Sequence, residues 1–138
     1  MLVVVDTNVL LSALISSTGP PDRIYQAWRE KRFDIVTCPE QLAELRTASR
    51  YPRLANAVRP YKFGVLINQL KKSLIAAKSI PHTHAAHDPE DSFLLNLAQF
   101  VGAHYLITGD KQSRILLQRT VGETRILAAR EFCDQVLC

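Results

Sequence analysis

Three things are scarce in this chain, and each excludes a class of protein. Its three cysteines, Cys38, Cys133 and Cys138, lie far apart without C-x-x-C spacing, so they indicate neither a disulfide framework nor a zinc site. No apolar run reaches the roughly 18 residues of a membrane span, and the apolar N-terminus lacks the basic region of a signal peptide. Repeats and low-complexity tracts are missing too. We expect one domain over residues 1–138, in the cytoplasm and without membrane association.

Acidic residues are absent from one long stretch. Between Glu44 and Asp88 there is no aspartate or glutamate, and the rest of the chain has a net charge of −4 within an overall +4. A basic region beside an acidic one suits a polyanion bound near a metal ion, although a solvated helical face would have the same composition. The basic residues of this interval are Arg46, Arg50, Arg53, Arg59, Lys62, Lys71, Lys72 and Lys78.

Short apolar runs alternate with helical patterns along the chain. Leu2–Val5 and Tyr105–Thr108 are β-branched or apolar without alternation, which is typical of strands buried on both faces of a parallel sheet. This alternation predicts a doubly wound, parallel α/β sheet. Further strands are predicted at 33–38, 79–81 and 124–127, and helices at 9–15, 22–31, 39–50, 61–78, 88–101, 114–118 and 129–136.

Each of the two apolar runs ends beside an aspartate. Asp6 follows the first run directly, and Asp110 follows the second after Gly109. In an open α/β sheet the ligand site lies outside the carboxyl ends of the strands. Asp6 and Asp110 are therefore predicted to meet in one crevice, although 104 positions separate them.

Two helices are candidates to add carboxylates to the same crevice. Glu44 lies one turn into the helix that begins at Pro39, and it is nearer the apolar stripe than Glu40. Asp91 lies in the first turn of a later helix, where the helix dipole eases its charge. Asp88 precedes that helix and is a good N-cap, so capping alone would explain it.

Four converging carboxylates repel one another unless a cation lies between them. Oxygen-only ligation favours Mg²⁺ or Mn²⁺ over zinc. Such an ion can polarise a phosphoryl oxygen, supply a hydroxide-like nucleophile and offset charge on the leaving oxygen. We therefore interpret four acids as catalytic residues and metal ligands for phosphodiester hydrolysis: Asp6, Glu44, Asp91 and Asp110.

In their order and spacing, these motifs resemble the signature of the PIN-domain family over nearly the whole chain. The matching segments are Asp6-Thr7-Asn8, the helix-borne Glu44, Asp88-Pro89-Glu90-Asp91 and Thr108-Gly109-Asp110. The chain is most similar to the branch of toxin components of toxin–antitoxin systems. The resemblance implies a three-layer α/β/α fold with a parallel sheet of about five strands, and a Mg²⁺- or Mn²⁺-dependent ribonuclease.

The resemblance also implies roles for further residues and partners. Besides the four main acids, Asp88 matches an accessory acid, Asn8 the polar residue after the first Asp, Ser12 a small hydroxyl residue one turn on, and Thr108 the hydroxyl residue before the last acid. The implied partners are an RNA substrate, an antitoxin protein and a second copy of the chain in a homodimer. The candidate RNA-binding cations are Arg46, Arg50, Arg53 and Lys111.

Two other functions remain open. The same pocket could recognise RNA or a partner protein without cleavage, as a non-catalytic PIN-like module. Strand-end aspartates also serve phosphotransfer, but the motif of dehalogenase-like folds has an aspartate where this chain has Asn8.

Some conspicuous side chains are expected to have ordinary roles. His82, His84 and His87 lack the spacing of a helical H-x-x-x-H pair, so contact with a polyanion suits them better than metal ligation. Tyr51 and Tyr61 could stack on bases, but tyrosines in such positions more often pack at a helix end.

Overall fold

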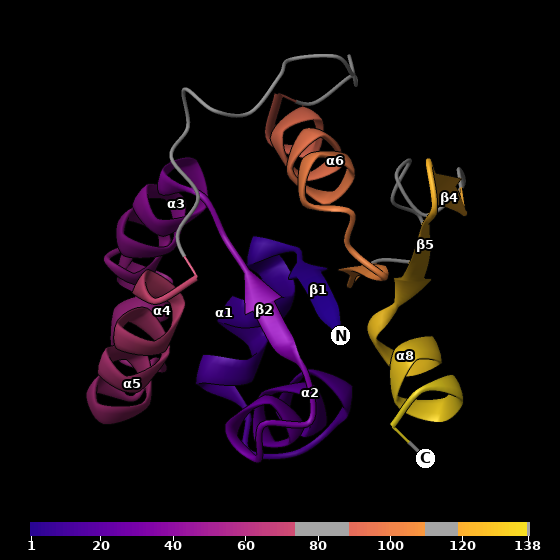
Figure 1. Ribbon diagram of the computed structural model, residues 1–138. Coiled ribbons are helices and arrows are strands. Elements are labelled where there is room, and N and C mark those ends of the chain that lie inside the picture. Colours follow the sequence, from indigo (N-terminus) through magenta and orange to yellow (C-terminus); the bar gives the residue numbers. More distant parts are fainter. Residues whose placement is uncertain (74–88, 110–118, 138) are drawn as a thin grey trace.

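A five-stranded sheet forms the centre of the protein (Figure 1). The computed structural model describes residues 1–73, 89–109 and 119–137, without the side chains of residues 53 and 89–92. Neighbouring strands are parallel in the order β2-β1-β3-β5, and β4 pairs antiparallel with β5 at the edge. The strands are β1 (Leu2–Val5), β2 (Asp34–Val36), β3 (Tyr105–Thr108), β4 (Thr120–Val121) and β5 (Thr124–Ala128).

Helices cover both faces of this sheet, which confirms the predicted α/β/α class. Figure 1 shows α6 on one side of the sheet and α1, α2 and α8 on the other, while α3, α4 and α5 stand together near β2. We call this last group the α3–α5 arm. The described helices are α1 (Thr7–Ile15), α2 (Pro20–Arg29), α3 (Pro39–Ser49), α4 (Pro52–Ala55), α5 (Pro60–Lys71), α6 (Pro89–Val101) and α8 (Ala129–Gln135).

The unbroken apolar run of β1 follows from these two covering layers. Val3 and Val5 belong to the core between the sheet and α1, whereas Val4 belongs to the core between the sheet and α6. All three side chains are fully buried. A strand covered on both faces has no position for a polar residue, so its sequence shows no alternation. Among the described helices, none is long and apolar enough to cross a membrane.

The edge of the sheet differs from the prediction. The two residues of β4 were missed, and they form a hairpin with β5 through Gly122, whose φ of 57° suits glycine. The sheet is therefore mostly rather than wholly parallel. The predicted helix at 61–78 is observed as Pro60–Lys71. The predicted strand at 79–81, the predicted helix at 114–118 and the three histidines of the 82–87 region lie outside the described residues.

The described cysteines are packing residues. Cys38 and Cys133 are buried free thiols. Burial raises the pKa of the Cys38 thiol to about 12 and raises that of Cys133 as well. Because the thiolate is the reactive form, neither side chain is suited to act as a nucleophile.

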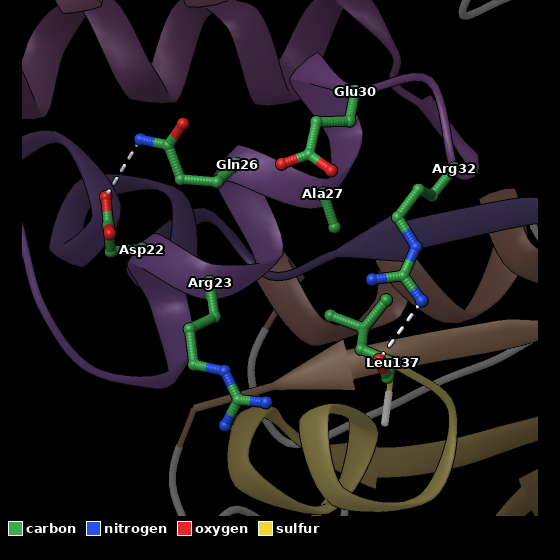
Figure 2. Close-up of a pocket in the computed structure, with 7 residues that line it drawn as sticks. All are labelled: Asp22, Arg23, Gln26, Ala27, Glu30, Arg32 and Leu137. Carbon is green, nitrogen blue, oxygen red and sulfur yellow. Dashed lines mark hydrogen bonds between the residues drawn. The ribbon is translucent and has the colours of Figure 1, made fainter.

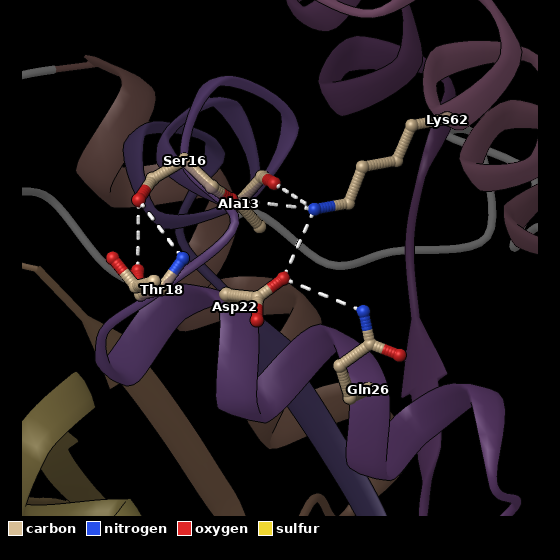
Figure 3. Close-up of polar contacts among 6 residues, drawn as sticks. All are labelled: Ala13, Ser16, Thr18, Asp22, Gln26 and Lys62. Atoms are coloured by element: carbon tan, nitrogen blue, oxygen red, sulfur yellow. Dashed lines mark hydrogen bonds and ion pairs between the residues drawn. The ribbon is translucent and has the colours of Figure 1, made fainter.

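Lys62 fastens the α3–α5 arm to the helices beneath the sheet (Figure 3). Its Nζ donates to the carbonyl oxygen of Ala13 in the last turn of α1, and pairs with Asp22 Oδ1 at 3.1 Å. It also lies 4.6 Å from the ring centroid of Tyr25. The last carbonyls of a helix have no partner within it and attract cations. Lys62 thus serves the fold, and it is not one of the basic interval's outward charges.

Candidate functional site

The candidate site lies where β1 and β3 end side by side. From β1 the chain continues to β2 on one side, whereas from β3 it continues to β5 on the other side. This reversal is the topological switch point at which α/β sheets bind ligands. The backbone N–H of Asp6 donates to the carbonyl oxygen of Ile107 at 2.8 Å, so the two strands stay paired up to this point.

Asp6 is held by groups from both strand ends. It is the N-cap of α1, and its Oδ1 accepts a hydrogen bond from the backbone N–H of Asn8 at 3.1 Å. The hydroxyl of Thr108, the last residue of β3, donates to Oδ2 at 3.4 Å. The side chain is half-buried. A carboxylate at a helix N-terminus is stabilised by the helix dipole, so this position favours an anion.

The chain leaves β3 very close to α1. A Cβ atom added at Gly109 would lie 3.1 Å from Cγ2 of Val9, nearer than side chains normally approach. Gly109 therefore allows the backbone after β3 to cross the first turn of α1 beside Asp6. Asp110 follows directly and lies outside the described residues, so its meeting with Asp6 stays a prediction.

A buried glutamine joins α3 to the end of β1. Gln41 is fully buried, and its Nε2 donates to the carbonyl oxygen of Val5, the residue before Asp6. Its Oε1 accepts a hydrogen bond from Thr37 Oγ1 at 2.7 Å. Sequence reasoning missed Gln41. The sequence does contain a sign of its burial, because Gln41 lies four positions before the apolar residue Leu45 and so on the same face of the helix.

Glu44 lies on the helix that Gln41 anchors. The two residues are three positions apart and so lie on neighbouring parts of one face of α3. Glu44 is half-buried, whereas Glu40 is exposed, in keeping with the preference for Glu44 as a ligand. Asp6 and Glu44 both have polar interactions in the fold. Through Gln41, the helix that carries Glu44 is tied to the strand end that carries Asp6.

Comparison with known proteins identifies the family of the chain. Residues 2–112 match the family described as PIN domain. The chain belongs to the PIN-domain family. The resemblance seen in the sequence is thereby confirmed at the level of the family, over a segment that includes both strand ends and α3.

One sequence relative and one solved structure extend the comparison. The uncharacterised protein MJ1680 of Methanocaldococcus jannaschii is 32% identical over 116 residues, which cover 79% of this chain and 70% of that protein. The crystal structure of VapBC2 from Rickettsia felis, bound to a DNA fragment from its promoter, contains a chain that superposes with a TM-score of 0.64. That match covers 93% of this chain and 98% of the other at 16% identity, so it shows a shared fold.

The remaining predicted site residues of this PIN domain fall into three groups. Asn8 and Ser12 are exposed on α1, Arg46 is exposed on α3, and Arg50 is exposed at the C-cap of α3. Asp91 lies in the first turn of α6, which contacts β1 and β3, but its side chain is not described. The same holds for Arg53 on α4. Outside the described residues lie Asp88 and Lys111.

The described side chains include only half of the predicted metal ligands. Within the described ranges no three His, Cys, Asp or Glu side chains form a group that could hold a metal ion. Of the four predicted ligands, only Asp6 and Glu44 have described side chains. The gathering of all four acids therefore stays a prediction.

A separate cavity of about 220 Å³ lies along α2 (Figure 2). Arg32 on its rim donates to the carbonyl oxygen of Leu137 at 3.0 Å. Arg32 precedes β2, and Leu137 follows α8, so the cavity lies toward the amino ends of the strands. It shares no residue with the candidate site. The lining residues are Asp22, Arg23, Gln26, Ala27, Glu30, Arg32 and Leu137.

Replacing Gln41 with leucine should lower the free energy of unfolding by about 1–3 kcal/mol, because the carbonyl of Val5 and the hydroxyl of Thr37 lose a buried partner. Urea denaturation measures this change. The matched control is Glu40→Gln on the same turn, which is exposed and should stay within about 0.5 kcal/mol of the wild type. An unchanged midpoint for Gln41→Leu would show that the network does not stabilise the fold.

Replacing Gly109 with alanine should destabilise the protein by about 1–3 kcal/mol, since the new methyl group would press on Val9. The variant Val9→Ala removes that contact, so the double-mutant cycle should show a coupling of at least about 0.5 kcal/mol. Unfolding midpoints of the four proteins give the coupling. As a control, Gly64→Ala in α5 has no atom within 4 Å and should be neutral or stabilising. Strict additivity at positions 9 and 109 would contradict the close approach.

Proposed function

We propose that this PIN domain is a Mg²⁺- or Mn²⁺-dependent endoribonuclease and the toxin of a toxin–antitoxin pair. The observation that carries the proposal is the carboxylate of Asp6, held between the ends of β1 and β3 at the switch point of the sheet. The proposed catalytic residues and metal ligands are Asp6, Glu44, Asp91 and Asp110, with Asn8, Ser12, Asp88 and Thr108 as accessory residues.

The described members of this set fit a hard divalent cation. Carboxylate oxygens are the donors that Mg²⁺ and Mn²⁺ prefer. Hydrogen bonds from Asn8 and Thr108 orient the carboxylate of Asp6, as is usual for carboxylates that bind metal ions. The thiol of Cys38, directly before α3, is kept protonated by burial and so offers no competing soft ligand.

The contribution of the chain to hydrolysis would be placement and charge. A bound ion supplies polarisation of the phosphoryl group and a water of lowered pKa. The Asn8 N–H and the Thr108 hydroxyl keep the carboxylate of Asp6 in one orientation. Gln41 keeps α3, and with it Glu44, against the end of β1. These links reduce the rearrangement needed when substrate binds.

The RNA backbone would be held by cations outside the acidic crevice. Arg46 is exposed on α3, the helix that also carries Glu44, and Arg50 is exposed at its C-cap, so phosphates bound there would lie within reach of the acids. Arg53 on α4 and Lys111 beyond β3 complete the proposed set. Lys62, in contrast, is engaged inside the fold.

The proposed partners follow from the sequence resemblance and from the shared fold. The VapBC2 match is a complex bound to promoter DNA, and the chain resembles the toxin branch of the PIN-domain family. We therefore propose an antitoxin that covers the acidic crevice, and a homodimer of the toxin.

Replacing Asp6 with asparagine should reduce Mn²⁺-dependent RNA cleavage by at least about 100-fold, because the variant loses the charge that holds the cation. Asparagine is an equally good N-cap, so the start of α1 and the thermal melt should be preserved. The control is Asp34→Asn, an exposed residue at the amino end of β2, which should cleave as the wild type does. Cleavage is measured on defined single-stranded RNAs.

Undiminished cleavage by a folded Asp6→Asn protein would overturn the nuclease assignment. RNA binding by the wild type without any cleavage in saturating Mn²⁺ would instead favour the non-catalytic module. The thermal melt separates both outcomes from a failure to fold.

Expression of the wild-type chain in a bacterial host should arrest growth, because cellular RNA would be cleaved, whereas expression of the Asp6→Asn variant should not. Co-expression of a short reading frame adjacent to the gene should relieve the arrest. Growth curves with and without that frame test the toxin role. Arrest that is equal for both variants would argue against it.

A further inference from the structure

The α3–α5 arm exposes two tyrosines. Tyr61 is 84% exposed and Tyr51 is 48% exposed, so the expectation that they pack at helix ends is wrong. Tyr51 is the residue before α4, and Tyr61 lies in the first turn of α5. An aromatic ring left almost wholly in water is available for contact with a ligand, whereas the other described tyrosines, Tyr25 and Tyr105, are buried or half-buried.

These rings stand on a fixed scaffold. Between them Val58 is buried in the main core, and Leu54 packs against the same core. Lys62, next to Tyr61, is tied to the last turn of α1 and to Asp22. The backbone that carries both rings is thus anchored on its inner side. Binding on the outer side would therefore cost little ordering of the chain.

The charge around the rings has one sign. Residues 45–73 contain no aspartate or glutamate, and each tyrosine has an arginine next to it or one residue removed: Arg50 before Tyr51 and Arg59 before Tyr61. Both arginines are exposed. Within the described part of the chain, neither forms an ion pair. A surface of exposed cations with interleaved aromatic rings is complementary to a chain of phosphates and bases.

We propose that Tyr51 and Tyr61 form a base-stacking surface for single-stranded RNA, with Arg50 and Arg59 contacting its phosphates. Unpaired bases present flat faces that stack on tyrosine without regard to sequence, while arginines bind the backbone. A second copy of the chain fits less well, because a symmetric contact through this surface would bring the positive charges of the two copies together. The choice of RNA as ligand rests on the proposed function. The arm would thus hold an RNA strand that runs along α3 toward Glu44.

The test is binding of a short fluorescent single-stranded RNA, measured by anisotropy in EDTA so that hydrolysis cannot interfere. Tyr61→Ala should weaken binding about tenfold, whereas Tyr61→Phe, which keeps the ring, should bind as the wild type does. Phe100→Ala is the matched control, since Phe100 is 45% exposed on α6, away from the arm. It should leave affinity unchanged.

An abasic oligomer with the same backbone separates stacking from charge. Tyr61→Ala should not affect its binding, whereas Arg59→Gln should weaken both ligands and reduce the salt slope by about 0.7. Unaltered RNA affinity of folded Tyr51→Ala and Tyr61→Ala proteins would overturn the stacking surface. So would an equal loss for the abasic oligomer, or a change of oligomeric state in place of RNA affinity.

The two proposals can fail separately. If the wild type cleaves RNA in Mn²⁺ but the tyrosine variants bind normally, the stacking surface is wrong and the nuclease stands. If the tyrosines govern RNA binding but no cleavage occurs in Mn²⁺, the surface stands and the nuclease is wrong.

Discussion

The parallel pairing of β1 with β3 is the constraint on which the rest of this structure depends. The register aligns Val5 with Ile107 and continues through the bond from the Asp6 N–H to Ile107. Because the pairing continues to this point, Asp6 and Thr108 lie together at the carboxyl ends of the two strands, and their side chains can form a hydrogen bond. A different register would move the two side chains apart and turn residues of both strands to the opposite face.

Two polar side chains, those of Gln41 and Lys62, hold the helices next to the carboxyl ends of β1 and β3. Gln41 ties the start of α3 to β1, and Lys62 ties α5 to the end of α1. Both side chains donate to carbonyl oxygens of buried residues, so their removal takes a hydrogen-bond donor from the interior, which is costly. The α3–α5 arm is therefore attached by specific hydrogen bonds at each end as well as by its apolar residues. Rigid attachment is what a site built from separate elements requires.

Acidic and basic side chains differ in their exposure on this side of the molecule. Asp6 at the end of β1 and Glu44 on α3 are half-buried, whereas Arg46 on α3 and Arg50 at its C-cap are exposed. On α3, Glu44 thus lies nearer the interior of the molecule than Arg46, and Arg50 is exposed just after the helix. A polyanion approaching this side would meet positive charge first, and the crevice behind it would need a cation of its own to accept a phosphate.

Much of the fold could be read from local patterns. The apolar runs of β1 and β3 and the helices of 39–50 and 88–101 were found, because burial on both faces and helical periodicity leave clear marks in a sequence. The two-residue strand β4 left no such mark, since its partner β5 creates it through a hairpin. The exposure of Tyr61 likewise depends on which side of α5 faces the core.

The sequence by itself determined the family, the α/β/α class and the position of Asp6 directly after a buried strand, because strands and helices leave local patterns and the family is marked by the order and spacing of its motifs along the chain. Only the tertiary structure decided that Thr108 bonds to Asp6, that Gln41 joins α3 to β1 and that Lys62 is used inside the fold. Each of these contacts joins residues at least 36 positions apart. Such contacts are set by strand register and helix docking, which no local pattern specifies.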